Sequence, residues 1–290
     1  MARRPRLRTV TSSGQVPDAR APARRHHCWG FDDPVALESR ARPFLGEGLA
    51  AGEQVWFVTA GAVEPVMRRW SAVTPFGAAL RDGTARVLSV AAGYADGGPV
   101  EPAAQVDVFA DALSGALAAG YTGLRVVADV TPLVRTPAQR AAFGRYEYLV
   151  DSFMAGRPVT GVCAFDRIAL DTGTFRDMAC LHPRGDSAGV PFRLYGCPPA
   201  DGAMVLAGEL DLAGRTQFEV ALARAAPRPV GGEIVIDASG LRFVDHRALR
   251  VLEEYAKRLR STVVLRGPVC VAAELVELLD LSHLRVEANA

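Results

Sequence analysis

The sequence has no run of roughly 18 consecutive apolar residues, the length that a membrane-spanning helix needs. It also has no cysteines in a C-x-x-C pattern, and its five cysteines are widely scattered. The first absence excludes a spanning helix, and the second argues against a disulfide framework and against a thiolate zinc site. We therefore expect a cytoplasmic protein with reduced cysteines and no membrane partner.

Signatures of several enzyme classes are missing as well. Residues 60–65 lie where a P-loop would hold phosphates after a strand, but they contain neither a lysine nor a hydroxyl group. The chain has no H-E-x-x-H and no G-x-G-x-x-G pattern. We therefore expect no catalysis, no cofactor and no resident metal ion.

The composition predicts two domains. A chain of 290 residues that is 49% hydrophobic is long enough to bury more than one core. The formal net charge is only +1, yet residues 1–25 carry seven arginines against one acidic residue, Asp18. Such a segment has too few apolar groups to fold, so we expect a disordered tail over residues 1–25. A basic tail alone is weak support for a nucleic-acid partner, and we expect none.

Residues 26–183 alternate between strand and helix patterns. Apolar strand patterns occur at residues 54–59, 85–90, 124–130 and 160–165, and helical patterns at 62–72, 102–119 and 137–155. This alternation predicts an α/β fold with a doubly wound, mainly parallel sheet. Ligands of such sheets bind beyond the carboxyl ends of the strands, where Thr59, Asp129 and Asp166 lie.

Short motifs in this region resemble the MEDS family of sensory domains over residues 26–183. The similar positions are His27, 43–49, Gly52, Glu53, Gly120, Arg125, Tyr146, Glu147, 163–166 and 181–183. The resemblance implies a sensory module with a degenerate P-loop ATPase-like fold and an unidentified small-molecule effector.

If the motif residues meet at the carboxyl edge of the sheet, one cleft would hold two imidazoles and three carboxylates, those of His27, Asp129, Glu147, Asp166 and His182. Such a cleft could bind a metal ion or a polar effector. The alternative is that these side chains cap local elements or pair with Arg125 inside the domain. The neighbours His26, His27 and Cys28 cannot all bind one ion, because successive residues of a strand face opposite sides.

A second informative segment spans residues 234–249. Residues 234–236 form a β-branched run typical of a buried strand, and residues 237–240 have the chemistry of a tight turn. Asp245 then stands where a helix N-cap is expected, followed by apolar residues at helical spacing.

This segment, together with residues 205–211, 265–267 and 275–281, resembles a STAS domain, the anti-sigma-factor-antagonist fold, over residues 190–290. The resemblance implies a small, mostly parallel sheet that binds an anti-sigma factor, which is also a kinase and phosphorylates a serine of the domain. At the matching positions this chain has Asp245, His246, Arg247 and Ala248, so no hydroxyl remains. We expect either phosphorylation-independent binding or a purely structural module. The family positions place the partner surface at Asp211, Asp245, His246, Arg247 and Arg250.

Residues 184–191 are short and turn-rich and predict a hinge between the first domain and a STAS-like domain at 192–290. The whole pattern predicts a signalling regulator whose partner is an anti-sigma factor or another regulatory protein. Two alternatives stay open. One is a small-molecule or nucleotide-binding enzyme centred on residues 26–183, and the other is a transcription regulator, for which no helix-turn-helix pattern is visible.

Overall fold

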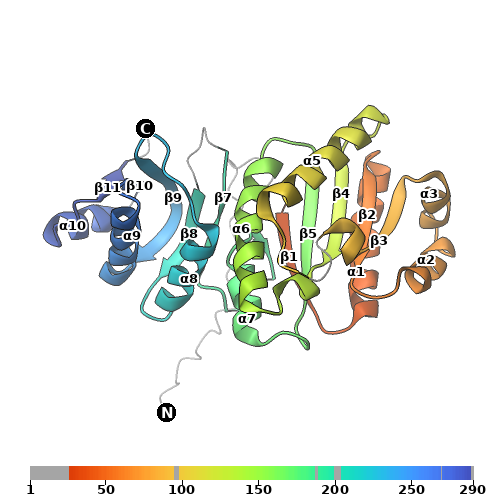
Figure 1. Ribbon diagram of the computed structural model, residues 1–290, viewed down its shortest axis with the longest axis horizontal. Helices are drawn as coiled ribbons and strands as arrows, with labels where there is room; N and C mark the ends of the chain where they lie inside the picture. Colours follow the sequence, from red (N-terminus) through yellow and green to blue (C-terminus); the bar gives the residue numbers. More distant parts are fainter. Residues whose placement is uncertain (1–25, 95–97, 187–188, 199–203, 269, 289–290) are drawn as a thin grey trace, which may run out of the picture.

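The computed structural model describes residues 26–94, 98–186, 189–198, 204–268 and 270–288. The tail predicted for residues 1–25 lies outside this part of the chain. Figure 1 shows two β-sheets side by side along the long axis, with helix α6 between them. Among the described residues, no helix is both long and apolar enough to cross a membrane.

The first sheet has six strands, all parallel, in the order β3-β2-β4-β5-β1-β6. The strands are β1 (His26–Phe31), β2 (Gln54–Thr59), β3 (Ala85–Ser89), β4 (Leu124–Asp129), β5 (Val159–Asp166) and β6 (Arg184–Gly185). Their side chains alternate between two cores, as expected for strands that are covered on both faces. The predicted doubly wound parallel sheet is confirmed.

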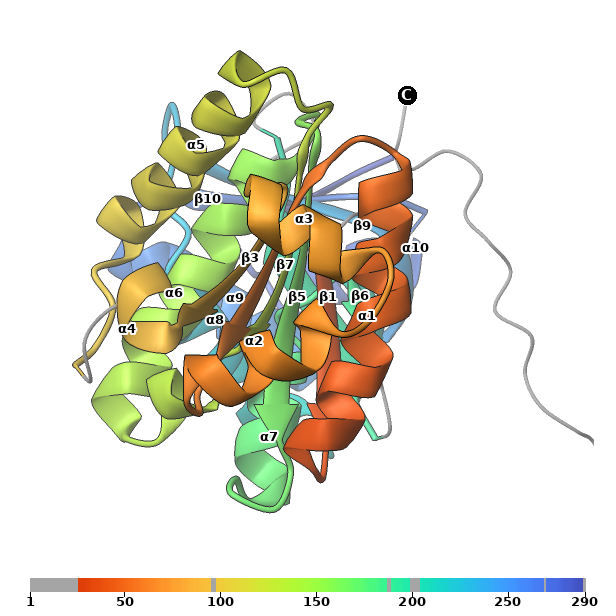
Figure 2. The same ribbon diagram turned by 90° about the vertical axis from the view of Figure 1, so that its right-hand side faces the viewer.

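Helices cover both faces of this sheet (Figure 2). One face packs against α1 (Pro34–Ala50), α2 (Val63–Ser71) and α3 (Phe76–Asp82). The other face packs against α4 (Val90–Gly93), α5 (Pro102–Ala118), the 3-10 turn η1 (Thr131–Val134), α6 (Pro137–Met154) and α7 (Thr172–Ala179). Helix α6 starts sharply, because Thr136 and Gln139 form a capping box and Pro137 occupies the first turn.

The second sheet has five strands in the order β11-β10-β9-β8-β7, parallel except for β7, which runs antiparallel to β8. The strands are β7 (Phe192–Gly196), β8 (Met204–Leu210), β9 (Glu233–Val244), β10 (Thr262–Arg266) and β11 (Leu284–Glu287). Its helices are α8 (Arg215–Ala225), α9 (His246–Arg258) and α10 (Cys270–Leu278). Asp245 caps α9 as predicted, since its carboxylate accepts from the backbone N–H groups of Arg247 and Ala248.

The turn predicted at residues 237–240 is wrong. Strand β9 continues through these residues to Val244 and pairs with β8 across two register shifts. Gly240 lies opposite Ala207, and a Cβ on Gly240 would lie 2.8 Å from the Ala207 side chain. The residues that favour a turn here form an irregular strand instead, because a β-bulge uses the same small and polar residue types.

The hinge predicted at residues 184–191 begins inside the first sheet. Arg184 and Gly185 pair with β1 as strand β6, and Asp186 accepts hydrogen bonds from Gly30 N and Arg40 Nη1 at 2.9 and 2.7 Å. Beyond this strand, the two sheets share one continuous hydrophobic core that includes Phe143 and Phe192. The two parts of the chain are therefore packed together rather than loosely joined.

Candidate functional site

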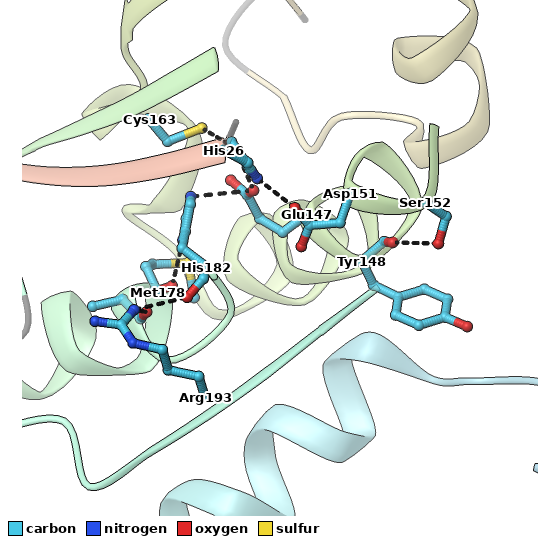
Figure 3. A network of polar contacts seen from close by, with 10 residues as sticks. His26, Glu147, Tyr148, Asp151, Ser152, Cys163, Met178, His182 and Arg193 are labelled. Atoms are coloured by element: carbon cyan, nitrogen blue, oxygen red, sulfur yellow. Dashed lines mark hydrogen bonds and ion pairs between the residues drawn. The ribbon is translucent and has the colours of Figure 1, made fainter. Parts of the chain in front are cut away.

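Five buried polar side chains from four segments meet beside the first sheet (Figure 3). They are His26 on β1, Glu147 and Asp151 on α6, Cys163 on β5 and His182 after α7. We refer to these five residues as the buried cluster. None of their side chains is more than 4% exposed.

Secondary-structure geometry explains how these residues converge. His26 and Cys28 are two residues apart in β1 and share a face, and Cys28 lies directly beside Cys163 of β5. Glu147 and Asp151 are four residues apart on α6 and also share a face. The segment after α7 then brings His182 to 4.5 Å from His26, measured between ring centroids.

The distances within the buried cluster are short. Glu147 Oε2 lies 3.4 Å from His26 Nε2 and 3.3 Å from His182 Nε2, and Cys163 Sγ lies 3.4 Å from His26 Nε2. One ligand atom from each of these four residues lies within 4.8 Å of the others. Neither carboxylate oxygen of Glu147 has a hydrogen bond of regular geometry among the described residues, although the Cys163 thiol lies beside this carboxylate, and His182 Nε2 has no hydrogen-bond partner there.

In both histidines the second ring nitrogen, Nδ1, lies beside an acceptor that is not one of the four clustered ligand atoms. His26 Nδ1 lies 2.8 Å from Asp151 Oδ1, and His182 Nδ1 lies 2.9 Å from the carbonyl oxygen of Met178. Because each Nδ1 faces an acceptor, each imidazole in its neutral form carries its proton on Nδ1. Its Nε2 then has a lone pair that faces Glu147. The centre of the buried cluster therefore holds more acceptors than donors.

Burial dominates the electrostatics of the buried cluster. It raises the pKa of Glu147 to about 7, although His26 acts to lower it. Burial also holds the pKa of His182 well below its usual value and raises that of the Cys163 thiol well above it. Burial alone would lower the pKa of His26, but the carboxylates of Glu147 and Asp151 raise it above its ordinary value.

A small cavity of about 30 Å³ adjoins the buried cluster. His26 and Cys163 line it together with aromatic and aliphatic side chains, among them Tyr94, Phe109 and Tyr146. A space of this size holds on the order of one or two water molecules.

Comparison with known families identifies both halves of the chain. A sequence model of the methanogen/methylotroph and DcmR sensory domain, MEDS, matches residues 25–183, which is more than half of the chain. The chain belongs to the MEDS family. A second model, described as the Mlab STAS domain, matches residues 195–286. A search of curated proteins finds no match.

These matches confirm the predicted pair of domains, a MEDS domain followed by a STAS domain. Together they make the chain a signalling regulator. The buried cluster lies in the MEDS domain, against the side that packs on the STAS domain. Glu147, Cys163 and His182 belong to motifs that carried the sequence resemblance to this family.

The predicted ligand residues of the MEDS domain do not form one site. Glu147 and His182 meet as expected, but their partners are His26, at the start of β1, and Cys163, in the middle of β5. Glu147 lies in the middle of α6, which returns along the sheet, so it cannot reach the carboxyl ends of the strands. The prediction of a shared cleft at the carboxyl edge is wrong.

Three predicted residues do lie at the carboxyl edge, but each accepts hydrogen bonds from the backbone of the turn that follows its own strand. Thr59 accepts from Gly61 N, and Asp129 accepts from Thr131 N, at 3.0 and 3.1 Å. Asp166 accepts from the backbone of the turn that follows β5. Burial raises the pKa of Asp129, while its bonds to Thr131 act to lower it. The alternative of local capping therefore describes these residues.

His27 faces the opposite side of the sheet from His26. Its ring contacts Phe44 of α1, with centroids 6.1 Å apart. Burial, then the positive charge of His26 and nearby arginines, lowers the pKa of His27 to about 4. Arg125, the suggested partner of Glu147, instead pairs with Glu53 at 2.6 Å. His27 is thus a packing residue of the α1 face.

Sequence reasoning missed His26, Asp151 and Cys163 as members of the buried cluster. Two periodicities could have found the first two: His26 and Cys28 share a strand face, and Glu147 and Asp151 share a helix face. Cys163 needs the additional knowledge that β1 lies beside β5, which no local pattern provides.

The expectation that the chain has no G-x-S-x-G pattern is wrong. Residues 185–189 read Gly-Asp-Ser-Ala-Gly and match the G-x-S-x-G pattern of a nucleophile elbow. That elbow joins a strand to a helix, whereas this segment lies between the strands β6 and β7. Ser187 is outside the described residues.

The predicted partner surface lies at the start of α9. His246, Arg247 and Arg250 are exposed there. Asp211 and Asp245 each bind backbone N–H groups of their own turns, and Asp245 N donates to Leu210 O. Two exposed apolar side chains lie in the same chain segments, Leu212 at 63% and Phe243 at 51% exposure. We refer to His246, Arg247, Arg250, Leu212 and Phe243 as the α9 surface.

Proposed function

We propose that this regulator couples the state of the buried cluster to the binding of a regulatory protein, an anti-sigma factor or a related regulator, by the α9 surface. The observation that carries the proposal is the position of α6. This helix supplies two carboxylates to the buried cluster and also forms the main contact with the STAS domain.

The two faces of α6 carry these two roles. Glu147 and Asp151 point into the buried cluster, while Tyr148 and Ser152 lie on the side away from it (Figure 3). Arg145 donates to the carbonyl oxygens of Ala225 and Ala226 at the end of α8. A change that moves α6 in the MEDS domain would therefore also displace the residues of the STAS domain that α6 contacts.

A second connection leaves the buried cluster through the backbone. Arg193 of β7 donates from Nη1 to the carbonyl oxygen of His182 at 2.7 Å, and Leu194 N donates to Cys180 O at 2.8 Å. Strand β7 is the edge of the STAS sheet. The segment that carries His182 is thus fixed to the STAS domain within a few ångströms of the buried cluster.

The sequence at the start of α9 supports control by the MEDS domain rather than by phosphorylation. Residues 245–248 offer no hydroxyl at the position where the STAS family is phosphorylated, so a serine kinase has no acceptor there. An intramolecular coupling of the usual 1–3 kcal/mol, roughly 5- to 150-fold in affinity, would replace that switch.

We propose binding rather than catalysis for the MEDS domain. The thiol of Cys163 is the only cysteine nucleophile in the buried cluster, and burial raises its pKa well above the usual value. It stays protonated at neutral pH and is a weak nucleophile. The cavity beside it has room for little more than water.

The proposed partner surface can be tested with the full-length chain. An Arg247→Glu and Arg250→Glu double variant reverses two exposed charges at the α9 surface, and an Arg68→Glu and Arg81→Glu double variant makes the same change on α2 and α3. Tagged proteins would be incubated with native lysate, and bound proteins identified by mass spectrometry. We expect an anti-sigma-type protein to be lost only with the first double variant. Equal capture by both double variants would contradict the proposal.

A further inference from the structure

We propose that His26, Glu147, Cys163 and His182 bind a divalent transition metal ion, with Zn²⁺ as the first choice. The inference deepens the proposed function by naming what occupies the buried cluster. Its test uses the purified chain without any partner, so the metal site and the partner surface can fail independently.

The donor set fits such an ion. Two imidazole nitrogens, one sulfur and one carboxylate oxygen are the ligand types of tetrahedral zinc sites. A harder ion such as Mg²⁺ or Ca²⁺ would demand oxygen ligands, of which this centre offers only those of Glu147. The sequence argued against a zinc site made of several thiolates, and this centre uses a single one.

The spacing of the donors fits as well. Metal–ligand bonds of roughly 2.0–2.3 Å place the corners of a tetrahedron roughly 3.3–3.8 Å apart. The contacts of Glu147 Oε2 with the two imidazole nitrogens are 3.4 and 3.3 Å long, and that between His26 Nε2 and Cys163 Sγ is 3.4 Å. The four atoms lie within 4.8 Å of one another, so small rotations about side-chain bonds would complete the tetrahedron.

The outer contacts of both histidines are those of metal ligands. A metal-bound imidazole usually donates its second N–H to a carboxylate or a backbone carbonyl. Asp151 Oδ1 accepts from His26 Nδ1, and Met178 O accepts from His182 Nδ1. Both Nε2 lone pairs are thereby directed at the same centre.

The buried acceptors at this centre need a positive charge. Glu147 and His182 are fully buried, and among the described residues His182 Nε2 has no hydrogen-bond partner, while the Cys163 thiol is the one group that can donate to Glu147. Native proteins rarely leave such groups unsatisfied. A bound dication, one thiolate and one carboxylate sum to zero charge, which suits a buried centre. Binding would release to water the Cys163 proton, and also the Nε2 proton of His26 and the Glu147 proton where those groups are protonated.

The experiment is a Co²⁺ titration of the full-length protein after treatment with a chelator, followed by competition with Zn²⁺. A tetrahedral site with one thiolate ligand produces a sulfur-to-cobalt charge-transfer band together with visible d–d bands. We expect one Co²⁺ per chain, displaced by Zn²⁺, and a rise in the thermal unfolding midpoint when Zn²⁺ is added. Metal analysis of the protein as purified provides an independent measurement.

Matched variants separate the site from surface binding. Cys163→Ser should lose the charge-transfer band, whereas Cys180→Ser, which changes another buried thiol, should keep it. His26→Ala should abolish binding, while His27→Ala, on the opposite face of the same strand, should not. Asp151 is a positioning residue in this scheme, so Asp151→Asn should weaken Co²⁺ binding by about 10- to 100-fold without removing the band.

The wild-type spectrum alone can overturn the proposal. If the chelator-treated wild-type protein binds no Co²⁺, or binds it without a thiolate band, the buried cluster is not a metal site and its protons are shared among the side chains. The same conclusion follows if Cys163→Ser and Cys180→Ser give identical titrations. Circular dichroism of each variant shows whether a loss of metal binding reflects a loss of folding. If a variant is unfolded, the Co²⁺ titration of the wild-type protein alone decides whether the buried cluster binds metal.

Discussion

At the scale of single residues, Glu147 is a carboxyl group held inside the protein beside two imidazoles. Its side chain is fully buried, and the nearest polar atoms are two imidazole nitrogens and a thiol. Burial raises its pKa to about 7, which means that ionisation is costly in this environment. A residue with these properties weakens the metal-free fold and strengthens any state in which a cation is bound.

Removing the charge of Glu147 should therefore stabilise the metal-free protein. In Glu147→Gln, the amide N–H groups can donate to the facing imidazole nitrogens, so we expect a gain of about 1–3 kcal/mol at mildly alkaline pH. The measurement is urea unfolding of chelator-treated protein. The same change should remove the stabilisation that Zn²⁺ gives.

Glu53→Gln is the matched control. Glu53 is also a buried carboxylate, but it is paired with Arg125 at 2.6 Å. Its neutralisation leaves the poorly exposed guanidinium of Arg125 with only a longer ion pair to the exposed Glu47, and should destabilise the protein. If both variants lose stability, Glu147 already has a compensating positive charge in the metal-free protein, and our account of the buried cluster is wrong.

At the scale of elements, the strands and helices that the sequence patterns placed in the MEDS domain agree closely with the structure, whereas α1, α3 and α7 were not predicted. The pattern for residues 54–59 coincides with β2, and those for 102–119 and 137–155 differ from α5 and α6 by one residue at the C-terminal end. Continuous apolar strands and amphipathic helices separated by Gly and Pro leave few alternatives. Local patterns sufficed for these three elements because each is specified by residues close in sequence.

The buried cluster could be predicted only in part. His26 and Cys163 are 137 residues apart, and their contact depends on the pairing of β1 with β5. Periodicity shows which face a side chain takes, but it does not reveal which strands are neighbours. The prediction of a site at the carboxyl ends of the strands rests on a general rule for open α/β sheets, and this site lies elsewhere.

The irregular part of β9 gives a prediction at the element scale. Gly240→Ala would place a Cβ 2.8 Å from the Ala207 side chain, so the pairing of β8 and β9 must shift. We expect a loss of about 1–3 kcal/mol in the free energy of unfolding, measured with urea. Gly46→Ala in α1 is the control, because nothing lies within 4 Å of its new methyl group. A free turn at residues 237–240 would instead tolerate Gly240→Ala as well as Gly46→Ala.

At the scale of the whole molecule, the two domains pack as one body. The hydrophobic core runs from Phe109 and Phe143 in the MEDS domain to Phe192 and Phe218 in the STAS domain. Asp177 of α7 and Arg224 of α8 add an ion pair of 3.0 Å across the contact. Two domains that share a core constrain each other, so a change in one shifts the preferred state of the other.

Gly196 of β7 is the position at which this coupling can be tested. A Cβ at Gly196 would lie 2.2 Å from the carbonyl oxygen of Tyr148 and 2.7 Å from Ser152 Oγ, so Gly196→Ala must push β7 and α6 apart. Tyr148 and Ser152 follow Glu147 and Asp151 in the sequence, and a displaced α6 would move both carboxylates of the buried cluster. We expect the Co²⁺ affinity to fall by about 2- to 30-fold, although Gly196 is no ligand.

Gly115→Ala provides the comparison for this variant, because its new methyl group on α5 meets nothing within 4 Å. Its Co²⁺ affinity should match that of the wild type. Linkage requires that a coupling between the two domains act in both directions, so a STAS-side change that weakens metal binding implies that metal binding alters the STAS domain. If Gly196→Ala destabilises the protein but leaves the Co²⁺ affinity unchanged, α6 does not transmit the state of the buried cluster, and the α9 surface would have to be controlled by another route.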